Sequence, residues 1–500
     1  MSHMYKPLIS VLPQDVLHHV FWLNTDMLED RGAKGSPPSA LTLIRSSHVC
    51  SSWRQLILSS PSLWGQVIDF DYLKDRDFRN EVIRRSRQSQ VSIMAWDSLS
   101  TNAQAADLED IVTFLEQHWD RVQNLELYLR SCDIRLWQMF EDRIWEVLQR
   151  PAHSLAVFFF SPPSDVGGTA NQPLQIQFPP ALNLFGNRAP QLRRFEAEII
   201  PFSPRAHWHR NIREFYLTGT LLLCDLLLAL QKMPLLERLH LDDCSHEANL
   251  PEVDLSTLPV VEVPSLKSVE MWIGVEIATP YISFLKHLKP RAFCLPVFCI
   301  ATGKQTSSDE RNLSKLDEFL GIFSAYCGLD LAPTIGVHVL KDGNFRLQAG
   351  GSSDGAWFEV NNMNPEVPLY RHYGEAFFPT LRRSAFRFIK EVSLAIEVGD
   401  FVFQDQHQII DFIQQFRSAT SLRTSPKSAA FFKQLPPDVL ANAFPSLDTI
   451  KFTASPEVDE IPSVQAFVRA MRDTGHQIET VSFPSPEYLK EFVGLRPVFE

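Results

Sequence analysis

The stretch "SHVCSSWRQLILSSPSLW", residues 47–64, places a cysteine, an arginine and two tryptophans within a run of apolar and small residues. Such a cluster belongs either to an active site or to the core of a small helical module. An active site would need a base that activates the thiol of Cys50. His48 is only two residues away, and two such positions on a helix do not face each other. The sequence therefore offers no base for Cys50, which argues against an active site.

Two apolar helices are predicted around this stretch. The segment "LPQDVLHHVF", residues 12–21, has apolar residues at helical spacing, and Pro13 suits a first turn, where its missing N–H costs nothing. A polar stretch with glycines and prolines predicts a loop over residues 24–39. A second helix is expected over about 40–58, capped by Ser39. Its apolar residues occupy most of its circumference, so the chain or a partner must bury it on more than one side.

These motifs resemble an F-box, in the F-box-like form common in basidiomycete fungi. The resemblance is carried by the Leu-Pro start, the Val-Cys-x-x-Trp-Arg helix and the Pro-x-Leu-Trp ending at Trp64. The insert over residues 24–39 is longer than in shorter F-boxes, which affects how that loop would fit a partner. Residues 1–67 are assigned to this helical domain.

The resemblance implies a partner and a docking surface. In this family the F-box helices dock on a Skp-type adaptor, and Trp53 and Trp64 are packing and docking residues. The resemblance also implies that Cys50 is a small buried hydrophobe. Leu63 and Trp64 are expected to close the module against the rest of the chain. The residues expected to bind the adaptor are Leu12, Pro13, Val16, Leu17, Val20, Phe21, Val49 and Trp53.

Strand-like pieces with the pattern apolar-x-x-apolar-x-apolar recur along the rest of the chain. They lie at residues 124–129, 154–160, 191–199, 211–219, 235–244, 265–273, 446–454 and 477–485. An amphipathic or apolar stretch often precedes the strand, as in a leucine-rich repeat of loose form. One strand and one helix per unit would then stack around a shared core, with Leu236, Leu239 and Leu241 pointing inward.

The predicted fold class is therefore α/β, with the F-box module followed by a leucine-rich-repeat-like solenoid over residues 68–500. The spacing between strand starts varies from 20 residues, Leu192 to Ile212, to 37 residues, Leu155 to Leu192. This scatter is wider than a regular repeat allows, so a non-repetitive α/β domain is the alternative.

Two segments depart from the repeat pattern. Residues 295–390 fit it least well and suggest an insertion or an irregular segment, with a hairpin over 335–351 around Asp342-Gly343. The segment "QLPPDVLANAF", residues 434–444, copies the start of an F-box but lacks the Cys-x-x-Trp-Arg helix. It is interpreted as an ordinary helix that precedes a repeat strand.

Composition argues against several classes of protein. The net charge is −12, and nucleic-acid binders usually carry a basic excess or a basic face. The basic residues between Lys74 and Arg87 alternate with acidic ones, which favours a solvated helix face over a nucleic-acid patch. Seven cysteines form no disulfide framework, so thiols in a reducing compartment are expected. Neither a signal peptide nor a membrane span is apparent, so we expect a soluble protein of the cytoplasm or nucleus.

Motifs of known chemistry are missing from the sequence. It has no phosphate-binding loop and no Gly-x-Ser-x-Gly elbow. Cys294 and Cys299 lack a second pair of ligands, and "HWHR" at 207–210 lacks a third, so it is interpreted as a surface loop. No catalytic residue, cofactor or metal ligand is predicted, and the chain is not expected to be an enzyme.

The resemblance implies a substrate-receptor subunit of a Skp–cullin–F-box ubiquitin ligase. The F-box would bind the Skp-type adaptor, and through it a cullin, while the repeats would bind a protein substrate. No nucleic acid or membrane is expected as a partner. One alternative is an interaction scaffold whose F-box-like module is purely structural. Another is an enzyme within residues 295–390, although no motif in that segment supports it.

Overall fold

A computed structural model describes most residues of the chain. The described residues are 12–25, 27, 38–96, 105–130, 132–163, 178–179, 182–198, 200–219, 223–243, 260–291, 294–302, 310–339, 344–350, 355–362, 381, 386, 388–396, 406–484 and 496–497. The chain divides into two compact units. Unit 1 comprises residues 1–218 and 228–236, and unit 2 comprises residues 219–227 and 237–500. Each unit is described by itself.

Unit 1 begins with four helices. They are α1 (Gln14–Leu23), α2 (Ser39–Ser47), α3 (Ser51–Ser59) and α4 (Pro61–Gly65). Pro13 is the residue before α1, and its carbonyl accepts the N–H of Leu17 at 3.0 Å. Pro13 is therefore the N-cap of α1, one position before the first helical turn in which the sequence predicted it.

The prediction of a single helix over residues 40–58 is wrong, because two helices occupy this segment. Helix α2 ends at Ser47 and α3 begins at Ser51. The Ser47 hydroxyl donates to the carbonyl of Ile44 at 2.7 Å, and serine side chains of this kind compete with the helix backbone. Cys50 is extended, with φ −156°, so the chain changes direction before α3. Ser39 is the first residue of α2, not its cap, and no side chain caps that helix.

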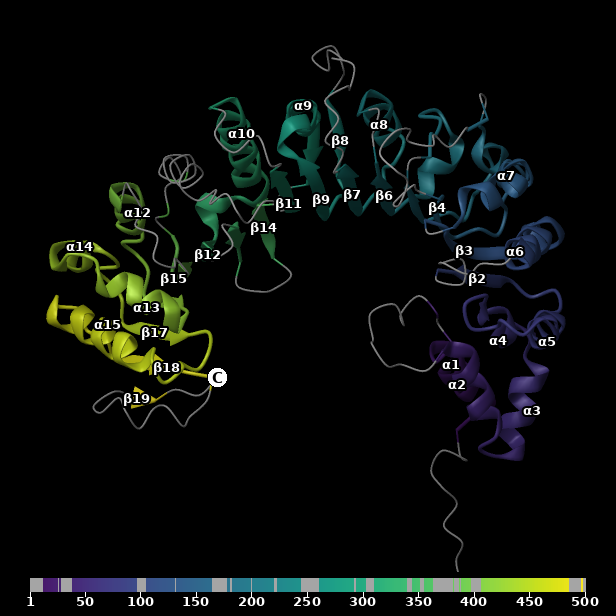
Figure 1. The fold of residues 1–500 in the computed structure, drawn as a ribbon, viewed down its shortest axis with the longest axis horizontal. Coiled ribbons are helices and arrows are strands. Elements are labelled where there is room, and N and C mark those ends of the chain that lie inside the picture. Colours follow the sequence, from purple (N-terminus) through teal and green to yellow (C-terminus); the bar gives the residue numbers. More distant parts are fainter. Residues whose placement is uncertain are drawn as a thin grey trace, which may run out of the picture. The chain divides into compact units, whose positions relative to one another are not determined.

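The rest of unit 1 alternates helices and strands (Figure 1). The elements are β1 (Ile68–Asp69), α5 (Arg76–Ser86), β2 (Val91–Ala95), α6 (Ala105–His118), η3 (Trp119–Arg121), β3 (Val122–Tyr128), α7 (Ile134–Leu148), β4 (Val157–Ser161), η4 (Leu184–Asn187), β5 (Arg194–Glu198), η5 (His207–Asn211) and β6 (Glu214–Thr218). Each strand from β1 to β6 pairs in parallel with the next one along the chain. Parallel neighbours require crossover connections, which explains why helical segments separate the strands.

The core of unit 1 lies between the strands and their helices. On β4, Phe158 and Phe160 are fully buried. Phe160 packs against Trp137 and Trp145 of α7, with ring centroids 6.2 Å and 5.7 Å away. Phe159 points to the opposite face, because successive strand residues alternate. The strands predicted at 124–129, 154–160, 191–199 and 211–219 are confirmed by β3, β4, β5 and β6.

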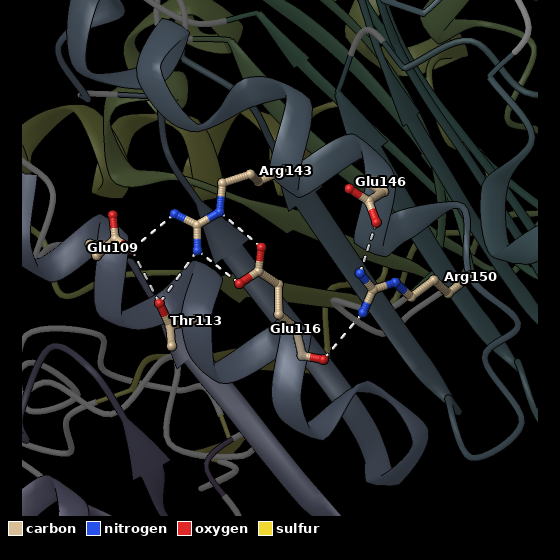
Figure 2. Close-up of polar contacts among 6 residues, drawn as sticks. All are labelled: Glu109, Thr113, Glu116, Arg143, Glu146 and Arg150. Atoms are coloured by element: carbon tan, nitrogen blue, oxygen red, sulfur yellow. Dashed lines mark hydrogen bonds and ion pairs between the residues drawn. The ribbon is translucent and has the colours of Figure 1, made fainter.

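Charged side chains join α6 to α7 (Figure 2). The Arg143 guanidinium donates to Glu116 at 2.8 Å and to Glu109 at 2.9 Å. These hydrogen bonds hold the pKa of Glu116 below its ordinary value. Arg150 donates to the Glu116 carbonyl at 3.2 Å and to Glu146 at 3.0 Å, which adds a second link between the helices.

The basic residues around α5 are not uniformly solvated, contrary to prediction. Arg84 and Arg85 do bind Glu81 on the exposed side of the helix. Arg79, however, is buried, forms an ion pair with Asp110 and donates to the Leu73 carbonyl at 2.9 Å. A guanidinium that is itself buried needs such partners, because an unpaired buried charge is costly. The tertiary contacts of Arg79 are not visible in the local charge pattern.

Unit 2 contains the remaining elements, and α8 (Leu223–Leu230) is divided between the two units. The elements of unit 2 are β7 (Arg238–Asp243), β8 (Val261–Val263), β9 (Ser268–Gly274), η7 (Val275–Ile277), α9 (Ala278–His287), β10 (Leu288–Pro290), β11 (Leu295–Thr302), α10 (Glu310–Cys327), η8 (Leu329–Leu331), β12 (Thr334–Val339), β13 (Phe345–Ala349), β14 (Ala356–Asn362), β15 (Glu391–Ile396), α12 (Gln406–Ile413), β16 (Ser421–Thr424), α13 (Pro426–Lys433), α14 (Pro437–Asn442), β17 (Thr449–Phe452), α15 (Ile461–Asp473), β18 (Thr480–Ser482) and β19 (Arg496–Pro497).

Most strands of unit 2 are also parallel. Strand β9 lies between β7 and β11, β8 pairs with β10, and β15 to β19 pair in sequence order. The strands predicted at 235–244, 265–273, 446–454 and 477–485 are confirmed by β7, β9, β17 and β18. Leu236, Leu239 and Leu241 are all buried, as predicted. Residues 434–444 contain the short helix α14, which precedes β17, so this second Leu-Pro motif starts an ordinary helix that is followed by a strand.

The predicted irregular segment contains a local reversal of strand order. Strand β12 is antiparallel to β13, which confirms the hairpin, although its turn residues 340–343 lie outside the described part of the chain. Strand β13 is antiparallel to β14, β14 is parallel to β11, and β12 is parallel to β15. The order in space is therefore β11, β14, β13, β12, β15, which explains why residues 295–390 lack the repeat pattern. The fold class is α/β, as predicted.

Candidate functional site

Helix α1 has one buried face and one exposed face. Leu17 and Phe21 are buried, and the Phe21 ring meets Trp53 of α3 edge to face at 5.0 Å. On its exposed side α1 carries three aliphatic residues at helical spacing, Val16, Val20 and Leu23, and Leu12 is exposed two residues before the helix begins. We call these four residues the α1 stripe, and their exposed fractions range from 38% to 54%. Single exposed aliphatic residues are common, but several of them together are typical of an interaction surface.

Further apolar side chains of the same module are exposed. Val49, in the turn between α2 and α3, is 64% exposed, and Leu58 of α3 is also exposed. Leu23 and Leu58 were not among the docking residues predicted from the sequence. The position of Leu23, three residues after Val20, already places it on the exposed face of a helix.

The eight predicted docking residues fall into three groups. Leu12, Pro13, Val16, Val20 and Val49 are exposed. Leu17 and Phe21 lie inside the module, and Trp53 is half-buried against Phe21. The buried residues hold α1 against α3, so that the exposed ones are presented on a fixed helix. A role of any of the eight in docking stays a prediction.

Trp64 and Leu63 connect the helices to the residues that follow, as expected. Both are buried, and Trp64 Nε1 donates to the carbonyl of Ile57 at 2.9 Å. The guanidinium of Arg85, on α5, lies 4.7 Å from the centroid of the Trp64 ring. His18 of α1 lies within hydrogen-bond distance of the Ser62 hydroxyl, 3.2 Å away. The four helices are therefore joined to each other and to α5.

Cys50 is exposed, so the prediction that it is a buried hydrophobe is wrong. It lies in the turn before α3, where the helix break turns its side chain outward. The Ser52 hydroxyl lies 3.1 Å from Cys50 Sγ, and this hydrogen bond is the main reason why the pKa of the Cys50 thiol is lowered. A hydroxyl is not a general base at neutral pH, so this contact adds no support for catalysis.

The histidines of "HWHR" do not lie together in a surface loop, contrary to prediction. They belong to η5, in which His207 is exposed and His209 is fully buried. His209 lies among Trp208, Phe202 and Phe215, at ring-centroid distances of 4.2 Å, 6.1 Å and 6.4 Å. Burial lowers its pKa to about 3, with a further contribution from the positive charge of Lys232. This imidazole is a neutral core group at neutral pH.

Among the residues that the structure describes, no group of three His, Cys, Asp or Glu side chains could hold a metal ion. Cys294 and Cys299 are both buried. Burial raises the pKa of Cys294 to about 12, and Cys299 Sγ accepts a hydrogen bond from Asn361 at 2.9 Å.

No helix of the described residues is both long and apolar enough to cross a membrane.

Comparison with known families identifies the helical module. Residues 9–68 match the family model described as F-box-like, so the chain carries an F-box-like domain over these residues. The matched segment contains α1 to α4 and ends at Ile68, the first residue of β1. No curated protein matches the chain. The α1 stripe therefore belongs to a domain of a class that typically binds Skp-type adaptors.

Proposed function

We propose that the chain is a substrate-receptor subunit of a Skp–cullin–F-box ubiquitin ligase. The F-box-like domain over residues 9–68 carries this proposal, together with the apolar side chains that its first helix leaves exposed. In this role the domain binds the Skp-type adaptor, and the adaptor links it to a cullin.

The α1 stripe is the proposed centre of the adaptor interface. Leu12, Val16, Val20 and Leu23 form one apolar line, and Val49 adds a neighbouring apolar side chain in the same domain. A helix that lays such a line into an apolar groove is a common mode of recognition. Leu17 and Phe21, packed against the module's interior, would position the stripe without contributing most of the contact area.

We also propose that residues 68–500 form a leucine-rich-repeat-like solenoid that captures the protein substrate. The support is the parallel pairing of consecutive strands in each unit, with a helix or 3₁₀ turn before most of them. Stacked strand–helix units of this kind offer extended surfaces for binding proteins.

The proposed receptor performs no chemistry itself. Its contribution would be to hold the substrate beside the ubiquitin-transferring enzyme, which raises the effective concentration of one relative to the other. No cofactor is needed for this task.

The adaptor interface can be tested by isothermal titration calorimetry with a purified Skp-type adaptor. The double variant Val16→Asp with Val20→Asp places two charges on the α1 stripe. We expect adaptor affinity to fall at least about tenfold, because charged groups would be desolvated at an apolar interface. The matched control is Met139→Asp on α7, another exposed apolar residue of unit 1.

The outcomes separate the receptor from an interaction scaffold whose F-box-like module is structural. Full binding by the double variant would show that the α1 stripe is not the adaptor site. Failure of the parent chain to bind any Skp-type adaptor would favour the scaffold. If binding follows the prediction, reconstituted ubiquitin transfer to co-purified proteins should require residues 9–68.

A further inference from the structure

One face of the unit 2 sheet is covered by helices. Phe298 of β11 packs against Phe319 and Phe323 of α10, with centroids 5.9 Å and 6.2 Å away. Figure 1 shows α9 and α10 on this side of β9 and β11. Leu241 and Met271, on β7 and β9, point to the same side and are buried. On each of these strands, the residues that alternate with them point to the other face of the sheet.

That other face exposes a tryptophan. Trp272 of β9 is 36% exposed, which makes it one of the most exposed large aromatic side chains in unit 2. Its Nε1 donates to the Glu270 carboxylate at 2.9 Å. Its ring meets Trp357 of β14 edge to face, at a centroid distance of 6.4 Å and an interplanar angle of 84°. Both contacts restrict the indole, so little rotamer freedom remains to be lost on binding.

Two carboxylates flank Trp272. Glu270 lies two residues earlier on β9 and therefore on the same face. Asp242 on β7 is the cross-strand register partner of Trp272, in a strand about 4.8 Å away. A Glu270 carboxylate oxygen also lies 3.2 Å from His240 Nδ1. The interaction with His240 is the main reason why the pKa of Glu270 is lowered. The Glu270 group is thus an anionic carboxylate at neutral pH and retains acceptor sites beyond these two contacts.

The same sheet face shows how this arrangement receives a cation. The Arg346 guanidinium lies 5.3 Å from the centroid of the Trp357 ring. It donates to Glu359 at 2.7 Å and 3.0 Å, so an indole and a carboxylate hold one guanidinium. Trp272 has the indole and the carboxylates of such a site. Among the described residues, no arginine or lysine stacks on its ring.

We propose that Trp272, Glu270 and Asp242 form a binding site for an arginine or lysine side chain of a protein partner. The cation would stack on the exposed face of the indole and donate to the flanking carboxylates, as Arg346 does at Trp357 and Glu359. The net charge of −12 would speed the approach of a basic segment. If the chain is the proposed substrate receptor, its substrates would be proteins with an arginine- or lysine-containing segment. Only the word substrate depends on the proposed ligase function; the binding site itself does not.

The test is fluorescence anisotropy with the full-length chain at physiological salt. The probes are two labelled peptides, one of alternating arginine and serine and one of alternating glutamate and serine. We expect the arginine peptide to bind and the glutamate peptide not to bind. Trp272→Ala and Glu270→Gln should each weaken binding of the arginine peptide by about tenfold.

Two matched variants control for general effects of charge and of surface aromatics. Glu262→Gln removes the same charge from an exposed position on β8. Phe388→Ala removes an exposed aromatic ring beside β15, five strands from β9 in the pairing order. Both should bind the arginine peptide like the parent. Because Glu270→Gln is nearly isosteric, it keeps the test valid even if Trp272→Ala alters the local fold.

Two results would overturn the site. One is equal affinity of the parent, Trp272→Ala and Glu270→Gln for the arginine peptide. The other is equal affinity of the parent for both peptides. The adaptor titration on the same variants separates the two proposals. Lost arginine binding with normal adaptor binding matches this site, and retained arginine binding without adaptor binding refutes only the ligase role.

Discussion

Helix α1 and strand β7 both carry regularly spaced aliphatic residues, but these residues are buried in β7 and largely exposed on α1. Leu239 and Leu241 of β7 are almost completely inaccessible. Val16 and Val20 of α1, which are no less apolar, remain in large part exposed. The sheet is covered on its apolar face by helices of the same chain, whereas α1 is covered on one side only. The chain therefore completes its own sheet core but leaves apolar side chains of its F-box-like domain exposed.

The largest expected effect comes from placing a charge in the self-covered region. Leu239→Asp would bury a carboxylate without a partner and should cost more than about 4 kcal/mol of unfolding free energy. A loss of this size is a large part of the stability of a typical domain. Urea unfolding followed by circular dichroism should show that the variant is largely unfolded or has a strongly lowered midpoint. Leu295→Asp, at an exposed leucine of β11 in the same sheet, should retain the parent midpoint. Equal midpoints for both variants would contradict the assigned facing of the strand.

A pair of variants on α1 tests the comparison within one helix. Phe21→Ala removes a buried ring that packs on Trp53 and should destabilise the protein by about 3 kcal/mol. Val16→Ala should leave the free energy of unfolding nearly unchanged, because its side chain is already exposed. Thermal unfolding of both variants measures this difference. If Val16→Ala proved as destabilising as Phe21→Ala, the α1 stripe would belong to the core.

His209 offers a pH-dependent test of the self-covered region. Its folded-state pKa of about 3 lies below the ordinary value of 6.5, so between these pH values the unfolded chain binds a proton that the folded chain does not. Its contribution to stability is complete above pH 6.5 and is lost as the pH falls toward 3. At pH 5 the loss should be about 2 kcal/mol.

Replacement of His209 isolates this effect. His209→Phe removes the titrating group, so its stability relative to the parent should rise between pH 7 and pH 5, as measured by urea unfolding at each pH. His207→Gln, at the exposed histidine of the same 3₁₀ turn, should follow the pH profile of the parent. Parallel profiles for the parent and His209→Phe would mean that His209 is protonated in the folded protein.

The smallest expected effect concerns the charges that link α6 to α7. The Arg143 ion pairs are partly exposed, with 35% of the arginine side chain accessible. Arg143→Met should cost about 1 kcal/mol, and the cost should shrink at high salt. Arg79→Met, at the buried pair with Asp110, should cost more and depend less on salt. A salt-independent cost at Arg143 would indicate that packing, not charge, joins the two helices.

Much of the secondary structure follows from local sequence. The apolar-x-x-apolar-x-apolar pattern located eight strands correctly, because alternate burial is a property of each strand and needs no knowledge of its neighbours. The Leu-Pro and Trp-Arg motifs located the F-box-like domain through their resemblance to known F-boxes. The helix break at residues 48–50 was missed, because the back-bonding of Ser47 competes only weakly with helix propensity.

Burial of polar residues and the order of strands could not be predicted in this way. Arg79 became a core residue because Asp110, distant in sequence, supplies its counter-charge. One of the aromatic rings around His209, that of Phe215, lies on β6 and not in η5. The isolated segment "HWHR" therefore looks like a surface turn.

The sequence by itself determined where eight of the strands lie, where the F-box-like domain lies and which residues of those strands alternate inward. These properties depend on backbone preference and apolar period over a few residues. The tertiary structure alone decided that β12 and β14 exchange places and that α1 keeps an open apolar stripe. It also set Trp272 beside Asp242, one strand away. Such outcomes depend on contacts between residues far apart in sequence, whose energies no local pattern contains.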